Sequence, residues 1–263
     1  MKKIIILTFI TLVTAHVASA QDWAKSKIDK SPRHGEWVKI KHGEREVNCF
    51  ISYPEVKNKA TAVVVIHEIF GLTDWARNMT DELAEAGYIA IAPDLLTTTN
   101  GGTDEIIKGG GDVRKSIQTL PPAQLTADLD AVVAYVTNLP SCNGRVAVAG
   151  FCWGGGQAFR FAANNAEIRA GFVFYGSPPD AEAIKRIHCP VYGFYGGNDA
   201  RVTATIPKAA EMMKAAGKTY EPVTYEGAGH GFMRAGEAPD ATVANRKARD
   251  EAWKRWKDLL GNI

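Results

Sequence analysis

Hydrophobic positions along the chain follow two patterns, one typical of buried strands and one typical of helices. Short continuous apolar runs, rich in β-branched residues, predict strands that are buried on both faces of a sheet. These runs lie at 61–66, 88–92, 145–149, 171–175, 191–195 and 222–225. Apolar residues three or four positions apart predict helices, one after an N-cap at Asp74, one that begins at Pro121-Pro122, and a last one over 242–260.

Two alternating segments, 36–40 and 46–53, flank His42-Gly43 and predict an antiparallel hairpin at the start of the fold. Farther along, strands and helices alternate, which favours an α/β fold with a mostly parallel central sheet and helices on both of its faces. The 95–120 segment shows neither pattern. A loop of that length is expected to be a functional lid or a disordered segment.

The first 20 residues have the pattern of a secretory signal peptide. Lys2 and Lys3 precede an apolar run, and Ala18-Ser19-Ala20 offers a small-x-small cleavage site. The run contains about ten strongly apolar residues, whereas a membrane-spanning helix needs about 20, which argues against a transmembrane anchor. We therefore expect an exported, periplasmic protein, with residues 21–263 as a single domain.

The charge of the chain gives no reason to expect a nucleic acid or an anionic membrane as partner. The formal net charge is +2, and loss of two lysines with the signal peptide takes it to about zero. We expect a monomer that binds a small molecule and has no stable membrane association after cleavage.

The four cysteines, Cys49, Cys142, Cys152 and Cys189, contain no C-x-x-C pair and no zinc-ligand spacing. We therefore predict no metal and no cofactor. Apart from Cys152, these cysteines could form at most one disulfide. The simpler expectation is that Cys49 and Cys189 lie on strands as small buried hydrophobic residues.

Residues 146–156 read VAVAGFCWGGG, a buried strand that turns directly into a helix, with Cys152 on the turn. Such a turn forces a positive φ on its central residue, and Gly150 and Gly154 remove side chains that would clash there. The start of a helix favours a thiolate, so Cys152 is a candidate nucleophile. The alternatives are a buried structural cysteine and a dinucleotide-binding turn, but the G-x-G-x-x-G pattern is absent.

A nucleophile on this turn needs a general base and an acid that orients the base, in the chain order nucleophile, acid, histidine. After Cys152, His188 directly precedes a strand, whereas His230 lies in a glycine-flanked loop after the last strand. Asp199 also follows a strand directly, whereas Asp180 lies among helix-starting residues. We predict that Cys152, Asp199 and His230 meet at the carboxyl edge of the sheet.

An oxyanion intermediate needs two backbone N–H groups. One is expected from Trp153, the residue after the nucleophile, and the other from the 67–71 loop. His67-Glu68 also begins the H-E-x-x-H pattern of zinc proteases, but Gly71 stands where the second histidine would be.

With these motifs the sequence resembles the dienelactone hydrolase family of α/β-hydrolases, over nearly all of residues 21–263. The residues that carry the resemblance are Glu68-Ile69-Phe70-Gly71, Ala92-Pro93-Asp94-Leu95, Gly150-Phe151-Cys152-Trp153-Gly154-Gly155, Phe174-Tyr175-Gly176, Gly196-Gly197-Asn198-Asp199 and Gly229-His230-Gly231-Phe232. A serine esterase would normally carry serine in place of Cys152.

The resemblance implies a role for each residue of the candidate site. Cys152 would be the nucleophile, His230 the general base and Asp199 the group that orients it. Ile69 and Trp153 would supply the oxyanion N–H groups.

The resemblance also implies a substrate class, enol-lactones that carry a carboxylate and are opened to a keto-diacid. Glu68 would contact the resting thiol and take part in forming the thiolate when substrate arrives. Arg234 and Tyr175 would bind the substrate, together with a second cation from the lid, Arg114 or Lys108. Arg201, just past Asp199, is another cation near the site.

Hydrolysis of carboxylic esters or lactones through a thioester is therefore the predicted function, with dienelactone ring opening as its specific form. The alternatives are an exported carboxylesterase with another substrate, a non-catalytic ligand-binding α/β domain, and a cysteine amidase or glutaminase. Such amidases usually place the acid two residues after the histidine, where this chain has Phe232.

Overall fold

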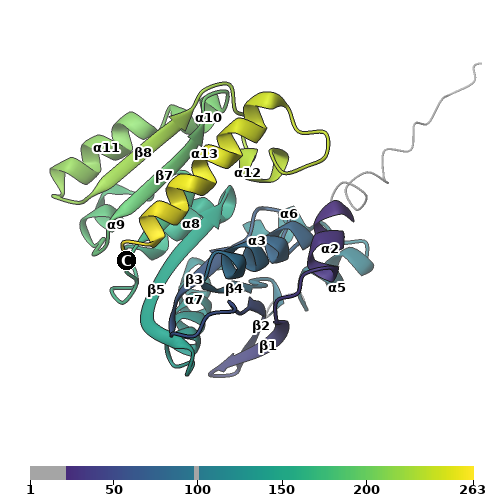
Figure 1. Ribbon diagram of the computed structural model, residues 1–263. Coiled ribbons are helices and arrows are strands. Elements are labelled where there is room, and N and C mark those ends of the chain that lie inside the picture. Colours follow the sequence, from purple (N-terminus) through teal and green to yellow (C-terminus); the bar gives the residue numbers. More distant parts are fainter. Residues whose placement is uncertain (1–21, 98–100) are drawn as a thin grey trace, which may run out of the picture.

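At the centre of the molecule lies an eight-stranded sheet, within the residues that the computed structural model describes, 22–97 and 101–263 (Figure 1). The predicted signal peptide, 1–20, lies outside these residues. In chain order the strands are β1 Gly35–His42, β2 Arg45–Ser52, β3 Ala60–Ile66, β4 Ile89–Pro93, β5 Cys142–Phe151, β6 Gly171–Phe174, β7 Val191–Gly196 and β8 Tyr220–Tyr225. Their order in the sheet is β1-β2-β4-β3-β5-β6-β7-β8.

Only the first part of the sheet is antiparallel. Strand β2 is antiparallel to both of its neighbours, β1 and β4, and every pairing from β4 across to β8 is parallel. The predicted hairpin and the mostly parallel sheet are thereby confirmed. Strands β3 and β5 are neighbours although β4 comes between them in the chain. The strand order therefore reverses direction between β3 and β5. In α/β proteins, ligands usually bind at the carboxyl ends of the two strands where the order reverses.

Helices cover both faces of this sheet. Within the described residues they are α2 Asp22–Asp29, α3 Asp74–Glu85, α5 Thr103–Lys108, α6 Val113–Gln118, α7 Pro122–Thr137, α8 Trp153–Phe161, α9 Ala181–Lys185, α10 Ala200–Thr203, α11 Ile206–Ala215, α12 Phe232–Ala235 and α13 Val243–Leu260. Helices α3 and α13 pack on one face, and α7, α8 and α11 pack on the other (Figure 1).

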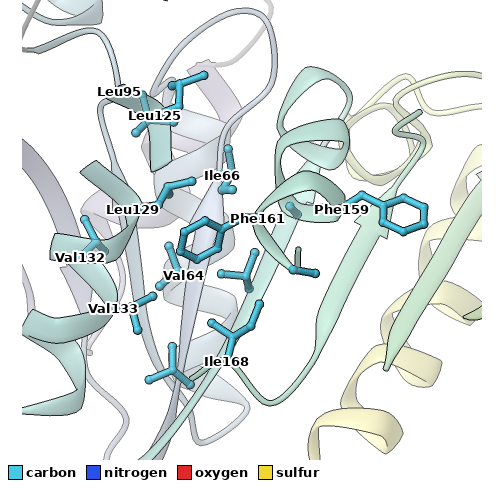
Figure 2. Close-up of a cluster of buried hydrophobic side chains, with 14 of the residues drawn as sticks. Val64, Ile66, Leu95, Leu125, Leu129, Val132, Val133, Phe159, Phe161 and Ile168 are labelled. Atoms are coloured by element: carbon cyan, nitrogen blue, oxygen red, sulfur yellow. The ribbon is translucent and has the colours of Figure 1, made fainter. Parts of the chain in front are cut away.

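Alternating side chains along β3 explain why two core layers form. Val63 and Val65 belong to the buried cluster that also contains Trp75 of α3. Val64 and Ile66 belong to the opposite cluster, between β3, α7 and α8 (Figure 2). Because neighbouring side chains of a strand point to opposite faces, a strand covered on both sides is apolar throughout. Each fully buried side chain of this size contributes about 1.5–3 kcal/mol to folding.

The described part of the 95–120 segment is not structureless, because it contains α5 and α6. The side chain of Asp112 caps α6 by accepting hydrogen bonds from the N–H groups of Arg114 (2.9 Å) and Lys115 (3.3 Å). Ile106 and Ile117 anchor the two helices in the core. Each helix is only six residues long, too short for a periodic apolar pattern to reveal it.

Helix starts lie close to their predicted places. Thr73 is the N-cap residue of α3 and Asp74 is its first residue, so the helix begins one position earlier than predicted. The Asp180 side chain accepts a hydrogen bond from the Ala183 N–H (2.8 Å) and caps α9. No helix among residues 22–97 and 101–263 is long and apolar enough to cross a membrane.

All four cysteines are free thiols. Cys49, Cys142 and Cys189 are buried, and Cys152 is half-buried. The disulfide that the sequence left open is not formed. Cys49 is a buried residue of β2, as predicted, and Cys189 is buried too, although it lies two residues before β7 and not on a strand.

Candidate active site

Cys152 lies on the turn between β5 and α8, at the carboxyl edge of the sheet. Its backbone has φ 56° and ψ −116°, a conformation that residues with a side chain rarely adopt. A Cβ at Gly150 would overlap the backbone of Gly154, and a Cβ at Gly154 would overlap the carbonyl oxygens of Ile66 and His67. The two glycines therefore let strand, turn and helix approach closely, as predicted.

A chain of hydrogen bonds joins the thiol to a buried carboxylate. His230 Nε2 lies 3.0 Å from Cys152 Sγ, and His230 Nδ1 lies 2.5 Å from Asp199 Oδ2. The other oxygen of Asp199 accepts a hydrogen bond from the Val202 N–H (3.4 Å) at the start of α10. Because a carboxylate only accepts hydrogen bonds, Nδ1 carries a proton and Nε2 faces the sulfur.

Backbone contacts fix the acid and the base relative to each other. The 197–199 loop follows β7, which ends at Gly196, and the 226–230 loop follows β8. The Asn198 N–H donates to the carbonyl of Ala228 (2.8 Å). A Cβ at Gly196 would overlap carbonyl oxygens of the 226–230 loop. Glycine at this position lets the two loops lie in direct contact.

The surroundings of His230 favour its charged form. The hydrogen bond with Cys152 and, against the cost of burial, the bond with Asp199 raise the pKa of His230 to about 9. Below that pH the ring carries a positive charge next to the sulfur. A positively charged ring and a helix start are surroundings that nucleophilic cysteines of enzymes share, so the position of Cys152 suits a nucleophile.

The backbone N–H groups of Ile69, in the 67–71 loop, and of Trp153, the residue after Cys152, have no hydrogen-bond partner among the described residues. Strands β3 and β5 are paired up to Ile66 and Gly150, so the 67–71 loop and the Cys152 turn leave the sheet side by side. Unpartnered N–H groups from these two segments are what an oxyanion hole requires.

Glu68 is buried next to these groups, with 3% of its surface exposed. Its carboxylate accepts hydrogen bonds from Arg234 Nε (2.7 Å) and from the Tyr175 hydroxyl (3.3 Å). The resemblance implies that Glu68 contacts the resting thiol. In the structure the thiol is hydrogen-bonded to His230, and Glu68 is held by Arg234 and Tyr175.

Tyr175 supports Glu68 from within the core. It is 1% exposed and has a positive φ of 42°. Burial, and then the charge of Glu68, raise the pKa of Tyr175 well above its ordinary value, so the hydroxyl remains a neutral donor. The resemblance implies that Tyr175 binds the substrate. In the structure its side chain is closed off from solvent and contacts Glu68.

Two arginines contact the ring of Phe70. Arg114 of α6 has its Cζ 4.9 Å from the ring centroid, and Arg234 of α12 has its Cζ 5.2 Å away. Arg234 is paired with Glu68, whereas Arg114 forms no ion pair within the described chain. Lys108 is exposed and pairs with a neighbouring glutamate, so of the candidate lid cations Arg114 is the one that the structure brings to the site.

The acids and histidines of this region do not form a metal centre. Among residues 22–97 and 101–263, no group of three or more His, Cys, Asp or Glu side chains is placed to hold a metal ion.

A sequence profile of the dienelactone hydrolase family matches residues 47–263. The chain belongs to this family. It is 31% identical to a Methylorubrum extorquens protein with the provisional name carboxymethylenebutenolidase, over 84% of this chain and 78% of that protein. A Saccharolobus solfataricus protein with the same provisional name is 28% identical and is matched over 83% of this chain and 95% of its own length.

The fold of the dienelactone hydrolase family is also found by structure comparison. The crystal structure of a provisionally named dienelactone hydrolase from Klebsiella pneumoniae superposes with a TM-score of 0.77, at 25% identity. The match covers 88% of this chain and 99% of that one. The predicted α/β-hydrolase fold is thereby confirmed, and membership of the family makes this protein a hydrolase.

Two residues of this dienelactone hydrolase family member had no role in the sequence interpretation, Phe70 and His67. Phe70 belongs to the Glu68–Gly71 motif, but nothing local indicates that two distant arginines flank it. His67 entered only as half of an absent zinc motif. Its position between a buried strand and the predicted oxyanion loop was the signal that could have found it.

Proposed function

We propose that this member of the dienelactone hydrolase family hydrolyses carboxylic esters or lactones through a thioester on Cys152. The observation that carries the proposal is the hydrogen-bonded chain from Cys152 through His230 to Asp199, on a turn with a positive φ. Dienelactone ring opening is the specific form of this reaction that the family resemblance supports.

In the acylation step, the Cys152 thiolate attacks the carbonyl carbon of the substrate. The carbonyl oxygen takes the negative charge and accepts hydrogen bonds from the N–H groups of Ile69 and Trp153. The carbon–oxygen ester bond then breaks, which leaves a thioester, and the charged His230 ring gives its proton to the leaving oxygen. An enolate leaves more readily than an alkoxide. A lactone whose ring oxygen leaves as an enolate therefore depends less on protonation by His230.

In the deacylation step, the neutral His230 ring takes a proton from water as the water oxygen attacks the thioester. The tetrahedral intermediate expels the Cys152 thiolate and releases the carboxylic acid. The proton stays on His230, and the Cys152 sulfur is free for the next reaction. Asp199 keeps the ring in the tautomer that both steps need.

We further propose that the substrate carries a carboxylate. Arg114 has a charge without a carboxylate partner in the described chain, and Arg234 contacts the same Phe70 ring. A substrate carboxylate that draws Arg234 away from Glu68 would leave the Glu68 charge uncompensated. An uncompensated buried carboxylate binds a proton more strongly, so Glu68 could then take part in deprotonating the thiol.

Trapping the thioester tests the proposed chemistry. An aryl ester mixed with excess enzyme and quenched in acid is expected to leave one acyl group on the peptide that contains Cys152, because deacylation is slower than departure of a phenolate. Peptide mass spectrometry measures this. Hydroxylamine should remove the label, as expected for a thioester. A quenched enzyme without an acyl group, or with the group on a serine, would contradict the proposal.

Substrate charge is tested at Arg114. Arg114→Gln is expected to raise KM about tenfold for an aryl ester with a free carboxylate and to leave the neutral aryl acetate unchanged, since an exposed charged hydrogen bond is worth about 1.4 kcal/mol. The control is Lys115→Gln, which removes an exposed charge from the adjacent position of α6. Equal losses for the two esters, or for the two variants, would count against a carboxylate site.

The proposal includes export of residues 21–263, which the charge, hydrophobic run and cleavage site of residues 1–20 support.

A further inference from the structure

His67 is a buried histidine that the proposed reaction does not use. It follows β3 directly and has 0% of its surface exposed. Its Nδ1 lies 2.8 Å from the backbone carbonyl oxygen of Glu68. Because that oxygen can only accept, Nδ1 carries the hydrogen and Nε2 has a free lone pair. Nε2 is buried and has no hydrogen-bond partner within the described residues.

The hydrogen bond between His67 and the Glu68 carbonyl fixes which ring nitrogen carries the proton. Burial lowers the pKa of His67, against the opposing charge of Asp94, so the ring is neutral at neutral pH. A neutral imidazole has one N–H, and the Glu68 carbonyl holds it at Nδ1. A buried Nε2 without a partner costs free energy. The ring holds this position despite that cost, and the bond from Nδ1 to the Glu68 carbonyl is the one hydrogen bond that it makes within the described residues.

The carbonyl that His67 holds belongs to the same peptide unit as the Ile69 N–H. In a trans peptide the C=O and the N–H point in opposite directions, and the described residues contain no cis peptide bond. Fixing the carbonyl on the His67 side therefore fixes the direction of the Ile69 N–H. The Gly71 N–H donates to the same carbonyl at 3.2 Å, but as part of a loop turn that can move with it.

The His67 ring also contacts the second candidate oxyanion residue. It is stacked on the Trp153 ring, with 5.5 Å between the centroids and an interplanar angle of 19°. A Cβ at Gly154 would overlap the His67 carbonyl oxygen, so the two segments lie in direct contact. One buried side chain thus touches both segments that carry an unpartnered N–H.

We propose that His67 is a positioning residue of the oxyanion hole, whose Nδ1–H holds the Glu68–Ile69 peptide with its N–H directed at the reacting carbonyl oxygen. The inference rests on the proposed function, since it assumes that an acyl oxyanion forms beside Cys152. A role of this kind acts on the transition state and leaves the thiol itself unchanged.

Two reactions of Cys152 separate the oxyanion hole from the thiol. Acylation by p-nitrophenyl acetate passes through an oxyanion. Alkylation by iodoacetamide displaces iodide from a saturated carbon and does not. His67→Phe keeps a flat ring against Trp153 but removes the donor. We expect it to slow acylation, measured as the p-nitrophenolate burst, by about 10- to 100-fold, with alkylation within about threefold of wild type.

His67→Asn provides the rescue. Its amide nitrogen is as many bonds from the backbone as Nδ1, so it can donate to the same carbonyl, and acylation is expected within about fivefold of wild type. His67→Gln has the same amide one carbon farther away and is expected to be slow. If the phenylalanine variant does not fold, the difference between these two amides decides the matter. His188→Asn, at an exposed histidine before β7, is the matched control and should behave as wild type.

The inference is overturned if His67→Phe acylates at the wild-type rate, if alkylation slows as much as acylation, or if His67→Asn is as slow as His67→Gln. Failure of the proposed function gives a different result: Cys152→Ala would then keep the burst, whatever the His67 variants do.

Discussion

Cys152→Ala is expected to lower kcat for aryl esters and for an enol-lactone by about 10⁶-fold, the size of effect seen when a hydrolase loses its nucleophile. The reason is that the thioester pathway needs a covalent bond to Sγ, and alanine offers no replacement atom. The change removes a single half-buried atom. Alanine has the same Cβ as cysteine, so the positive φ of the turn costs no more than before. The fold should therefore remain, as measured by circular dichroism and thermal unfolding.

Cys189→Ala is the matched control. Cys189 is a buried cysteine two residues before β7, far along the chain from the turn, and its loss should leave the rate constants unchanged. A Cys152→Ala protein whose kcat for either substrate is within tenfold of the wild-type value would contradict the thioester mechanism.

His230→Gln is expected to lower kcat by about 10⁴-fold, the upper end of what a general base contributes. Glutamine cannot take the proton of the attacking water, so deacylation should be the slower of the two steps. The acyl-enzyme should accumulate and be visible by mass spectrometry of the intact protein. His188→Gln, which changes the exposed histidine before β7, should have wild-type kinetics.

Asp199 adds a second measurement to this prediction. Since Asp199 acts through the His230 ring, to which it is bonded at 2.5 Å, Asp199→Asn should lower kcat in the wild-type background. In the His230→Gln background it should have almost no further effect, because residues that act as a unit are not additive. Independent, multiplying losses would mean that Asp199 does not work through the imidazole.

The sheet and the Cys152–Asp199–His230 constellation were predictable from the sequence for one physical reason. Parallel strands that are buried on both faces are apolar throughout, so their ends are visible, and all their carboxyl ends lie at one edge of the sheet. Polar residues placed directly after such strands must therefore come together. The glycines around Cys152 add a local backbone constraint that can also be read along the chain.

The surroundings of Glu68 could not be predicted in the same way. Its partners are Arg234 of α12 and Tyr175, the residue directly after β6, and their pairing depends on side-chain directions that no periodicity encodes. The placement of Arg114 beside Phe70 depends on α6, a helix too short to show a pattern. Long-range contacts between loops are specified by the whole packed fold, not by any one segment.

Sulfur chemistry in this protein is confined to one place. Burial raises the pKa of both Cys49 and Cys189, and Cys142 is closed off as well, so these thiols are protected from peroxides and electrophiles. Cys152 is the half-buried cysteine, and it sits beside a cationic ring. Oxidation follows thiolate character and access. A mild oxidant would thus convert the Cys152 side chain to its sulfenic acid and inactivate the protein, while the three buried thiols stay reduced.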